Sequence, residues 1–417
     1  GSGGSGGAIY LVVAGTLDGG GSMTADGGDG ATGTTDNGGG GGGGRISITH
    51  AGGTFGFSSA SLTVAAGAAG TGGTGLEEPG AKGTVYVLDS STSAVSIYHG
   101  FTYDDVDHSV TTWTTDSSAT NQYCTAGIVT PSVTAATLSL DGVITCTSAS
   151  LTSFNFIATS SFVLASGFTL DASGSKHDAD IDFTIPTSDD QVWTNVTITL
   201  PGSDNPNTDD EGGFFTIDDI IDLELAGTTS VNGNVSFTNL TGFTLGASAS
   251  LNASEYGCTA DWSGYGSGPN GSNVCASGVS FGGNGGGGGG GSGHGGAGGV
   301  SSASVVGGLA YDSLTAPVLI GSAGGADGSG YGGNGGGLIR IEVDAGDMSW
   351  NGAMSANGGT GLVSTNGGGG GAGGSVYITV SGTLSGTYVG VPVTVFGGTG
   401  GDGTADGGGG GGGRVRV

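Results

Sequence analysis

Apolar and polar residues alternate along the middle of the chain, between residues 84 and 256. Clear examples run from Leu138 to Leu140, from Phe154 to Phe156 and from Val196 to Leu200. Because successive side chains of a strand point to opposite faces, this period of two predicts strands that bury one face. The same period recurs at 162–164, 168–170, 181–183, 235–237 and 243–245. No segment has a helical period, so we expect an all-β chain.

The central part of the chain also contains a sequence repeat with a longer period. The segment 167–173 recurs, with one substitution, at 242–248. Three coils of about 25 residues would fill the interval between the two copies. Short strands with a coil-length repeat are typical of a parallel β-solenoid, also called a β-helix. A β-sandwich inserted between glycine-rich modules is the alternative, because period-two strands occur in both folds.

Glycine content divides the chain into three parts. Residues 1–83 form a glycine-rich β module, residues 84–256 a central or inserted strand-rich region, and residues 257–417 a second glycine-rich β module. In the two outer modules we expect strands at 8–13, 45–49, 61–64, 338–343, 348–354 and 375–380, joined by Asp-Gly-Gly or Asn-Gly-Gly corners that suit left-handed turns.

The two outer modules share sequence. Seven glycines at 38–44 precede Arg45-Ile-Ser-Ile, and seven at 407–413 precede Arg414-Val-Arg-Val. The segment around Tyr10 likewise matches the segment around Tyr377. We therefore expect interchangeable building blocks that associate head to tail. The predicted assembly residues are Ala8, Tyr10, Arg45, Ile46, Arg414, Val415 and Val417.

Glycine provides 101 of the 417 residues, and a third run of seven lies at 285–291. An extended glycine helix with three residues per turn rises ~3.1 Å per residue, so each run would span roughly 22 Å. Runs of equal length could lie in register, with their backbones close enough for N–H···O and Cα–H···O contacts. Loosely ordered loops are the alternative.

The glycine runs resemble the polyglycine-II bundles of snow-flea antifreeze proteins and of some phage tail-fibre adhesins. A second resemblance covers 280–417 and, by internal similarity, 1–50. Three segments are similar to glycine-rich repeats of very large secreted and cell-surface microbial proteins: the sequence around His294, the segment from Tyr311 to Gly321 and the segment from Leu338 to Val343. This resemblance implies an extracellular location and the β-solenoid architecture of adhesins or surface filaments.

Charge narrows the range of partners. The chain has 35 acidic and 6 basic residues, a formal net charge of −29. Electrostatics then disfavour nucleic acid and anionic lipid surfaces, whereas divalent cations are favoured. No apolar run approaches the ~18 residues of a transmembrane helix, so we expect no membrane span.

Three acidic clusters are candidate calcium sites, and calcium is the one candidate cofactor. The first is an oxygen-rich turn with Asp204, Asn207, Asp209 and Glu211. The second is the cluster of Asp104, Asp105, Asp107 and His108. The third is Asp178, Asp180 and Asp182, which would share one face of a strand. This triplet is also the best candidate for polysaccharide chemistry with paired carboxylates. No nucleophile elbow, phosphate loop or zinc motif accompanies it, so we do not expect an enzyme.

Four cysteines form two local couples, for which we predict the disulfides Cys124–Cys146 and Cys258–Cys275; four buried thiols are the alternative. Disulfides indicate an oxidising compartment. Five sequons within one stretch predict an exposed glycosylated face. They lie at Asn195, Asn234, Asn239, Asn252 and Asn270.

Arg45, Arg340 and Arg414 each follow glycines and begin a strand, and we expect them to bind glycine carbonyls or the corner residues Asp26 and Asp406. The predicted function is an extracellular structural protein, either a head-to-tail filament or a repeat of a giant surface fibre. An adhesin that binds glycans or calcium through residues 84–275, with Trp262 and Tyr265 exposed, is the alternative. A polysaccharide-acting β-helix enzyme is a third possibility.

Overall fold

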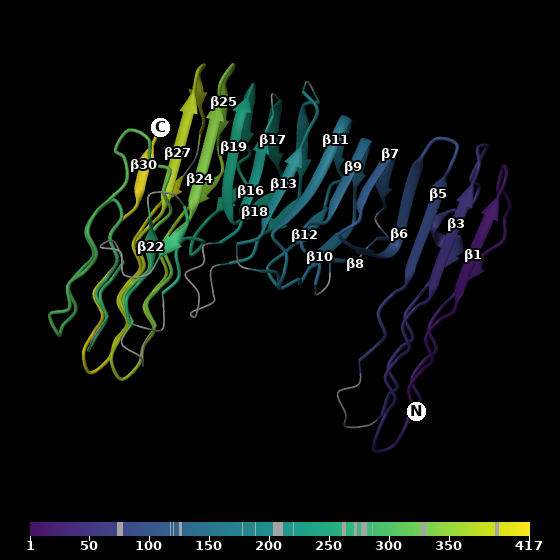
Figure 1. The fold of residues 1–417 in the computed structure, drawn as a ribbon, viewed down its shortest axis with the longest axis horizontal. Coiled ribbons are helices and arrows are strands. Elements are labelled where there is room, and N and C mark those ends of the chain that lie inside the picture. Colours follow the sequence, from purple (N-terminus) through teal and green to yellow (C-terminus); the bar gives the residue numbers. More distant parts are fainter. Residues whose placement is uncertain are drawn as a thin grey trace. The chain divides into compact units, whose positions relative to one another are not determined.

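A computed structural model gives the structure of the chain (Figure 1). It describes all residues except 73–77, 117, 120, 125–126, 177, 188, 203–211, 220, 261–263, 271–272, 277–281, 286, 327–330 and 388–391. The chain folds as two compact units, residues 1–147 with 156–170 and residues 148–155 with 171–417. The composition boundaries at 83 and 256 differ from these, because glycine-rich segments occur in both units.

The described secondary structure is almost entirely strand, as the alternation predicts. The first unit contains β1 (Ala8–Val13), β2 (Met23–Thr24), β3 (Arg45–His50), the 3-10 turn η1 (Ser59–Ser61), β4 (Leu62–Thr63), β5 (Thr84–Asp89), β6 (Ala94–Tyr103), β7 (Asp107–Thr115), β8 (Asn121–Cys124), β9 (Ser132–Leu140) and β10 (Val143–Cys146). Residues of both units form β11 (Ser153–Leu164) and β12 (Thr169–Asp171).

The second unit continues with many short strands. They are β13 (Asp180–Thr184), β14 (Gln191–Thr194), β15 (Thr197–Thr199), β16 (Phe214–Asp218), β17 (Asp222–Ala226), β18 (Ser230–Asn232), β19 (Asn234–Leu240), β20 (Gly242–Leu245), β21 (Ser250–Asn252), β22 (Gly268–Pro269), β23 (Cys275–Ala276), β24 (Leu338–Val343), β25 (Met348–Trp350), β26 (Ala353–Ser355), β27 (Ser375–Val380), β28 (Leu384–Ser385), β29 (Val393–Thr394) and β30 (Arg414–Arg416).

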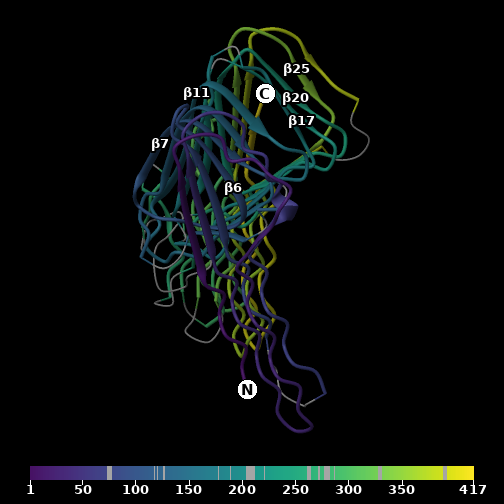
Figure 2. The same cartoon turned by 90° about the vertical axis from the view of Figure 1, so that its right-hand side faces the viewer.

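In the second unit the strands stack as coils with three sides. The coil β16–β17–β18 lies in parallel register on β19–β20–β21, and each residue pairs with the one 20 positions later, as Phe214 does with Asn234. Figure 2 shows β17, β20 and β25 together on one side of the coils. This is a parallel β-solenoid, and the predicted fold class is confirmed. The β-sandwich alternative does not fit these parallel ladders.

Coil length varies along the second unit. The step between the register partners Ile181 and Phe215 is much longer than the step from Phe214 to Asn234, and the step from Leu338 to Ser375 is longer still. The expectation of three equal coils of about 25 residues between the two similar segments is therefore wrong. Of the two similar segments, Gly242–Leu245 is β20 of the five-stranded sheet β14-β17-β20-β25-β28, whereas β12 is not a strand of that sheet. The excursions at the corners, which strand periodicity does not reveal, set the coil length.

The two glycine-rich modules have coils of matching length. In the first unit Ala8, Arg45 and Thr84 are successive register partners. In the second unit Leu338, Ser375 and Arg414 are successive partners, and both of their separations equal the corresponding separations in the first unit. The parallel order of the first unit is interrupted where β6 pairs antiparallel with β5.

Alternate residues of each strand fill the core. Ile46, Ile48, Val85 and Val87 form the core of the first glycine-rich module together with Leu62 and Val64. In the second unit the aromatic rings stack from coil to coil. Phe215 lies with its ring centroid 5.0 Å from that of Phe183 and 5.6 Å from that of Phe237. Aromatic pairs at such distances are favourable beyond the area they bury.

In the glycine-rich coils, the chain forms a glycine-rich hairpin between the third side of one coil and the first side of the next. Figure 1 shows these hairpins as segments without arrows, below β1, β3 and β5 in the first unit and below β24 and β27 in the second. Residues 38–44 hydrogen-bond with a period of three: the N–H groups of 38, 41 and 44 donate to the carbonyls of 31, 28 and 25. The N–H groups of 40 and 43 donate to the carbonyls of 78 and 81.

Residues 367–374 have a complete shell of neighbours. Their N–H groups donate, in three interleaved sets, to segments 356–362, 405–411 and 322–325. Their carbonyls accept from segments 289–292, 333–336 and 398–401. Six neighbours in a three-residue period are what hexagonally packed three-residue helices require. The runs are thus ordered, and the alternative of loosely ordered loops is ruled out for these described residues.

Glycine is needed in the interior of this bundle because the backbones touch. A Cβ atom on Gly371 would lie 1.9 Å from the carbonyl oxygen of Asn334, and one on Gly369 would lie 2.0 Å from that of Gly290. Residues that face outward have side chains, again with a period of three. Asp26 and Asp29 accept hydrogen bonds from the N–H groups of Ala65 and Ala68, at 2.6 and 2.7 Å, in the next hairpin.

Candidate functional site

The predicted assembly residues lie on β1, β3 and β30. Ala8 and Arg45 are exposed, and Tyr10 exposes 74% of its surface. Ile46, in contrast, is fully buried between its register partners Ile9 and Val85. The prediction that Ile46 contacts another molecule is therefore wrong, because the side chain points into the core of its own coil.

β1 and β30 each present apolar side chains at positions that other strands bury. Val415 pairs with the buried Val376 yet remains 46% exposed, and Val417 is 49% exposed. Leu11 pairs with the fully buried Ile48 and is itself only partly buried. β1 pairs with β3 and β30 pairs with β27, and no described strand is in register with the other edge of either one. Within the described residues, part of a coil core is therefore uncovered at each of these strands.

The three arginines that follow glycines do not share one role. Arg414 donates from Nε and Nη2 to the carbonyl of Tyr311, at 3.0 and 2.8 Å. Arg340 instead makes a bidentate contact with Glu342 on its own strand. The expected contacts with glycine carbonyls or with Asp26 and Asp406 are thus wrong for these two residues, because nearer acceptors occupy them.

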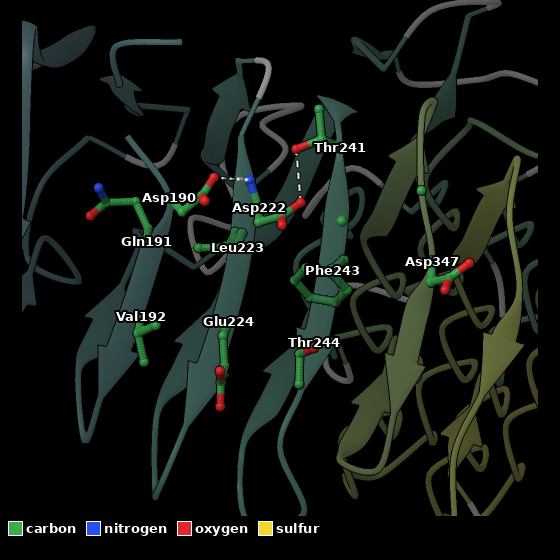
Figure 3. A pocket seen from close by; sticks show the side chains of 12 residues that line it. Asp190, Gln191, Val192, Asp222, Leu223, Glu224, Thr241, Phe243, Thr244 and Asp347 are labelled. Carbon is green, nitrogen blue, oxygen red and sulfur yellow. Dashed lines mark hydrogen bonds between the residues drawn. The ribbon is translucent and has the colours of Figure 1, made fainter. Parts of the chain in front are cut away.

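An open acidic groove crosses one side of the second unit (Figure 3). Its volume is about 550 Å³, and it runs over β14, β17 and β20 to Asp347, which precedes β25. Asp190, Asp222, Glu224 and Asp347 line it, together with Thr241 and Thr244. Phe243 also lines the groove but is 2% exposed, so it offers no aromatic face to a sugar ring.

Three of these acids already have backbone or hydroxyl partners. Asp190 accepts from the N–H of Asp222 at 3.1 Å, and Asp222 accepts from the hydroxyl of Thr241 at 2.8 Å (Figure 3). Asp347 accepts from the N–H of Thr383 at 2.6 Å. Each carboxylate therefore links its own coil to the next coil, which is a structural role. The groove leaves further carboxylate oxygens for hydroxyl-rich ligands.

The candidate calcium turn at Asp204, Asn207, Asp209 and Glu211 lies outside the described residues. The other two candidates are described. In the third, Asp180 and Asp182 lie on the outward face of β13, as predicted, while Ile181 and Phe183 point inward. Asp180 accepts from the N–H of Phe214 at 2.9 Å, and Asp178 pairs with Lys176. Within the described part of the chain, no three acidic, histidine or cysteine side chains are arranged to hold a metal ion.

Asp180 has an unusual acidity. The pKa of Asp180 is raised to about 6, mainly by burial and also by the nearby charges of Asp182 and Asp178, against the opposing effect of the hydrogen bond from Phe214. Burial also raises the pKa of Asp182. Like charges on one partly buried face thus favour a protonated carboxyl.

Both predicted disulfides are present, Cys124–Cys146 and Cys258–Cys275. Cys124 and Cys146 are register partners on the adjacent parallel strands β8 and β10, with their Cα atoms 4.6 Å apart. The disulfide therefore crosslinks two successive coils.

The five sequons differ in accessibility. Asn195, Asn239 and Asn270 are exposed, and Asn252 is partly exposed. Asn234 is fully buried, and its Nδ2 donates to the carbonyls of Gly212 and Tyr256 at 2.7 and 3.0 Å. The prediction of a glycan on Asn234 is wrong for the folded chain, because the amide nitrogen is already used inside the core.

The sequence did not predict a buried polar cluster that lies beside the glycine segment 367–374 in the second unit. The ring of His294 is fully buried, and its Nε2 lies 3.2 Å from Oδ2 of Asp312 and 3.4 Å from Oγ of Ser375. Its Nδ1 lies 2.6 Å from the carbonyl oxygen of Gly373. These residues are far apart in the sequence, and a lone histidine among glycines was the only available signal.

This cluster has the residue types of a nucleophilic triad but not its connectivity. In such a triad the base uses one ring nitrogen for the serine and the other for the carboxylate. Here Ser375 and Asp312 face the same nitrogen of His294, and a backbone carbonyl occupies the other. Ser375 is also fully buried, with its hydroxyl 2.7 Å from the carbonyl of Leu319. The arrangement fixes segments together and offers no site for a substrate.

The tryptophans provide little binding surface. Trp113 and Trp193 are fully buried, and Trp350 donates from its indole nitrogen to Gly352. Trp262 lies outside the described residues, whereas its expected companion Tyr265 is 52% exposed. No described helix is long and apolar enough to cross a membrane.

Comparisons with family models, with curated proteins and with solved structures gave no match to this chain.

Proposed function

We propose that this chain is a structural protein of an extracellular or cell-surface fibre, in which units of this kind associate head to tail through their outermost coils, either as separate copies or as repeats of one longer chain. The observation that carries the proposal is the uncovered coil core on β1 and β30. Leu11 and Val415 occupy positions whose register partners, Ile48 and Val376, are fully buried. A strand edge of this kind is a template for another strand.

The matching modules support this proposal. Both units contain coils of the same two lengths with glycine hairpins, so a coil from one copy has the dimensions of a coil from another. Contacts between unlike surfaces of identical units give filaments when the rotation between successive units does not close into a ring. Two disulfides and a surface rich in small polar residues fit an oxidising extracellular location.

The strand β1 allows a matched test by sedimentation velocity. Leu11→Glu would place a charge in the uncovered core of the coil, and we expect it to abolish concentration-dependent association. Tyr10→Glu places the same charge on the outward face and should leave association intact, since the side chain is 74% exposed. Thermal unfolding of both variants checks that the fold survives. Equal association of the two variants would count against assembly through β1.

A glycan-binding adhesin is a second candidate, and the acidic groove favours it. Its carboxylates and the hydroxyls of Thr241 and Thr244 could accept and donate hydrogen bonds to neutral sugars. Binding on a glycan array that is lost in Glu224→Ala would support this function. Unchanged binding, or none, would leave the groove as a structural feature of the coil.

A further inference from the structure

The buried ring of His294 connects three segments that are distant in the sequence. His294 lies on the glycine segment 288–295, and Asp312 lies in the loop that follows it. Gly373 belongs to residues 367–374, which we call the central glycine segment, and Ser375 is the first residue of β27. The side chains of His294 and Asp312 are 0% and 3% exposed. The hydrogen-bonding groups and any charges of these two side chains must therefore find their partners among protein atoms rather than in water.

The hydrogen-bond partners determine where the protons lie. A carbonyl oxygen has no proton to give, so Nδ1 of His294, 2.6 Å from the oxygen of Gly373, must carry one. If the ring were neutral, its Nε2 would then present a lone pair to Oδ2 of Asp312 at 3.2 Å. A lone pair facing a carboxylate in a dry interior is unfavourable, whereas an Nε2–H group would donate to it.

The surroundings of Asp312 indicate a carboxylate. Its Oδ1 accepts from the N–H of Ser313 at 2.7 Å, and its Oδ2 accepts from the N–H of Leu319 at 3.2 Å. Burial raises the pKa of Asp312, but hydrogen bonds from His294, Ser313 and Leu319 outweigh burial and leave the pKa below its ordinary value. Both oxygens are thus already engaged as acceptors.

The remaining neighbours are compatible with a cationic ring. The ring of Tyr311 lies 4.6 Å from that of His294, centroid to centroid, at an interplanar angle of 30°. An aromatic face attracts a cation at this distance. The hydroxyl of Ser375 lies 2.7 Å from the carbonyl of Leu319, which leaves an oxygen lone pair to accept from Nε2–H. The guanidinium of Arg414 donates to the carbonyl of Tyr311 and is also positive, so it disfavours a positive charge on the ring of His294.

We infer that His294 is a buried imidazolium paired with the Asp312 carboxylate, and that this ion pair is a lock that fastens the loop 295–320 to the central glycine segment 367–374. Protonation of Asp312 in acid removes the negative partner and weakens the lock. The glycine hydrogen bonds of 367–374 to its other neighbours do not depend on either charge.

Nitrogen-15 NMR of the intact wild-type chain tests the protonation state without any variant in the measured sample. The chain contains five histidines. The His294 signal can be assigned by its loss in His294→Gln. We expect both ring nitrogens to be protonated at about pH 6. A neutral ring at about pH 6, with Nε2 as an acceptor, would overturn the inference.

Hydrogen exchange followed by mass spectrometry tests the lock itself. After correction for intrinsic rates, protection of 295–320 should fall by about tenfold or more in His294→Gln, while β24 stays protected. His108→Gln is the matched control, because His108 lies the same 3.2 Å from Asp104 but at the surface, with side chains 22% and 57% exposed. Unchanged protection of 295–320 in His294→Gln, or equal loss in β24, would overturn the lock.

Discussion

Gly371 donates its N–H to the carbonyl of Gly359 at 2.9 Å, and this bond closes one of the six contacts around the central glycine segment. The two glycines belong to the ascending and descending arms of a single hairpin, joined at residues 363–366. One such bond contributes only about 0.5–1.5 kcal/mol. Ordering one residue costs a similar amount. The bundle therefore depends on the use of both the N–H and the carbonyl of every residue in 367–374.

Substitution of Gly371 tests this packing. We expect Gly371→Ala to destabilise the chain by about 2 kcal/mol or more, because its Cβ would lie 1.9 Å from the carbonyl oxygen of Asn334. Gly412→Ala is the matched control: the nearest atom would be 3.9 Å away, so stability should change by about 0.5 kcal/mol or less. Chemical denaturation measures both. Equal effects of the two alanines would contradict close backbone packing.

The length of the glycine runs predicts this packing, but the sequence obscures which segments join it. The neighbours of 367–374 include 322–325, 333–336 and 398–401, none of which contains a run of seven. A lattice position needs glycine only where the residue faces another backbone. Asp26 and Asp29, three residues apart, face outward and hold the next hairpin. A period of three in the side chains, rather than run length, is the fuller signal.

The acidity of Asp180 leads to a pH-dependent stability. Its pKa is about 6 in the fold, above the ordinary value, so protonation stabilises the folded chain as the pH falls through about 6. We expect Asp180→Asn to be more stable than wild type at about pH 7.5, since Asn is neutral and its Oδ1 still accepts from Phe214. The difference should shrink towards about pH 4. Thermal melts at both values measure it, and a difference that is constant with pH would be the contrary result.

Asn234 should be a stability residue rather than a glycan carrier. Its side chain satisfies the carbonyls of Gly212 and Tyr256 and accepts from the N–H of Leu338 at 2.8 Å. Asn234→Ala would strand these buried groups, and we expect a loss of about 2–4 kcal/mol. Ser236→Ala, at a partly exposed residue of the same strand, should cost much less. Urea denaturation with comparable losses for both residues would refute this assignment.

The disulfide Cys124–Cys146 crosslinks register partners of two coils and should stabilise the first unit. Its partners are 22 residues apart, which corresponds to about 3 kcal/mol in the loop-entropy account. We expect Cys124→Ser/Cys146→Ser to lower the melting temperature of the chain. Reducing agent should lower that of wild type too, but should change the variant only through Cys258–Cys275. If reducing agent leaves the melting temperature of wild type unchanged, the disulfide does not have this stabilising role.

The fold class could be predicted from the sequence because strand periodicity is local: Phe154 and Phe156 alternate with polar neighbours and are both buried. Coil length could not, since the similar segments at 167–173 and 242–248 contain strands of different sheets. The cluster of His294, Asp312 and Ser375 could not be predicted either. These three residues are far apart in the sequence and become neighbours only when the glycine segments pack, so no local pattern of residues predicts their contact.

Electron microscopy of the purified wild-type chain, combined with fibre diffraction, tests assembly through coil ends most directly. We predict filaments that lengthen as the protein concentration rises, with a spacing of about 4.8 Å along the axis from strand stacked on strand. Discrete particles of one chain at every concentration, with no such spacing, would contradict the proposed assembly.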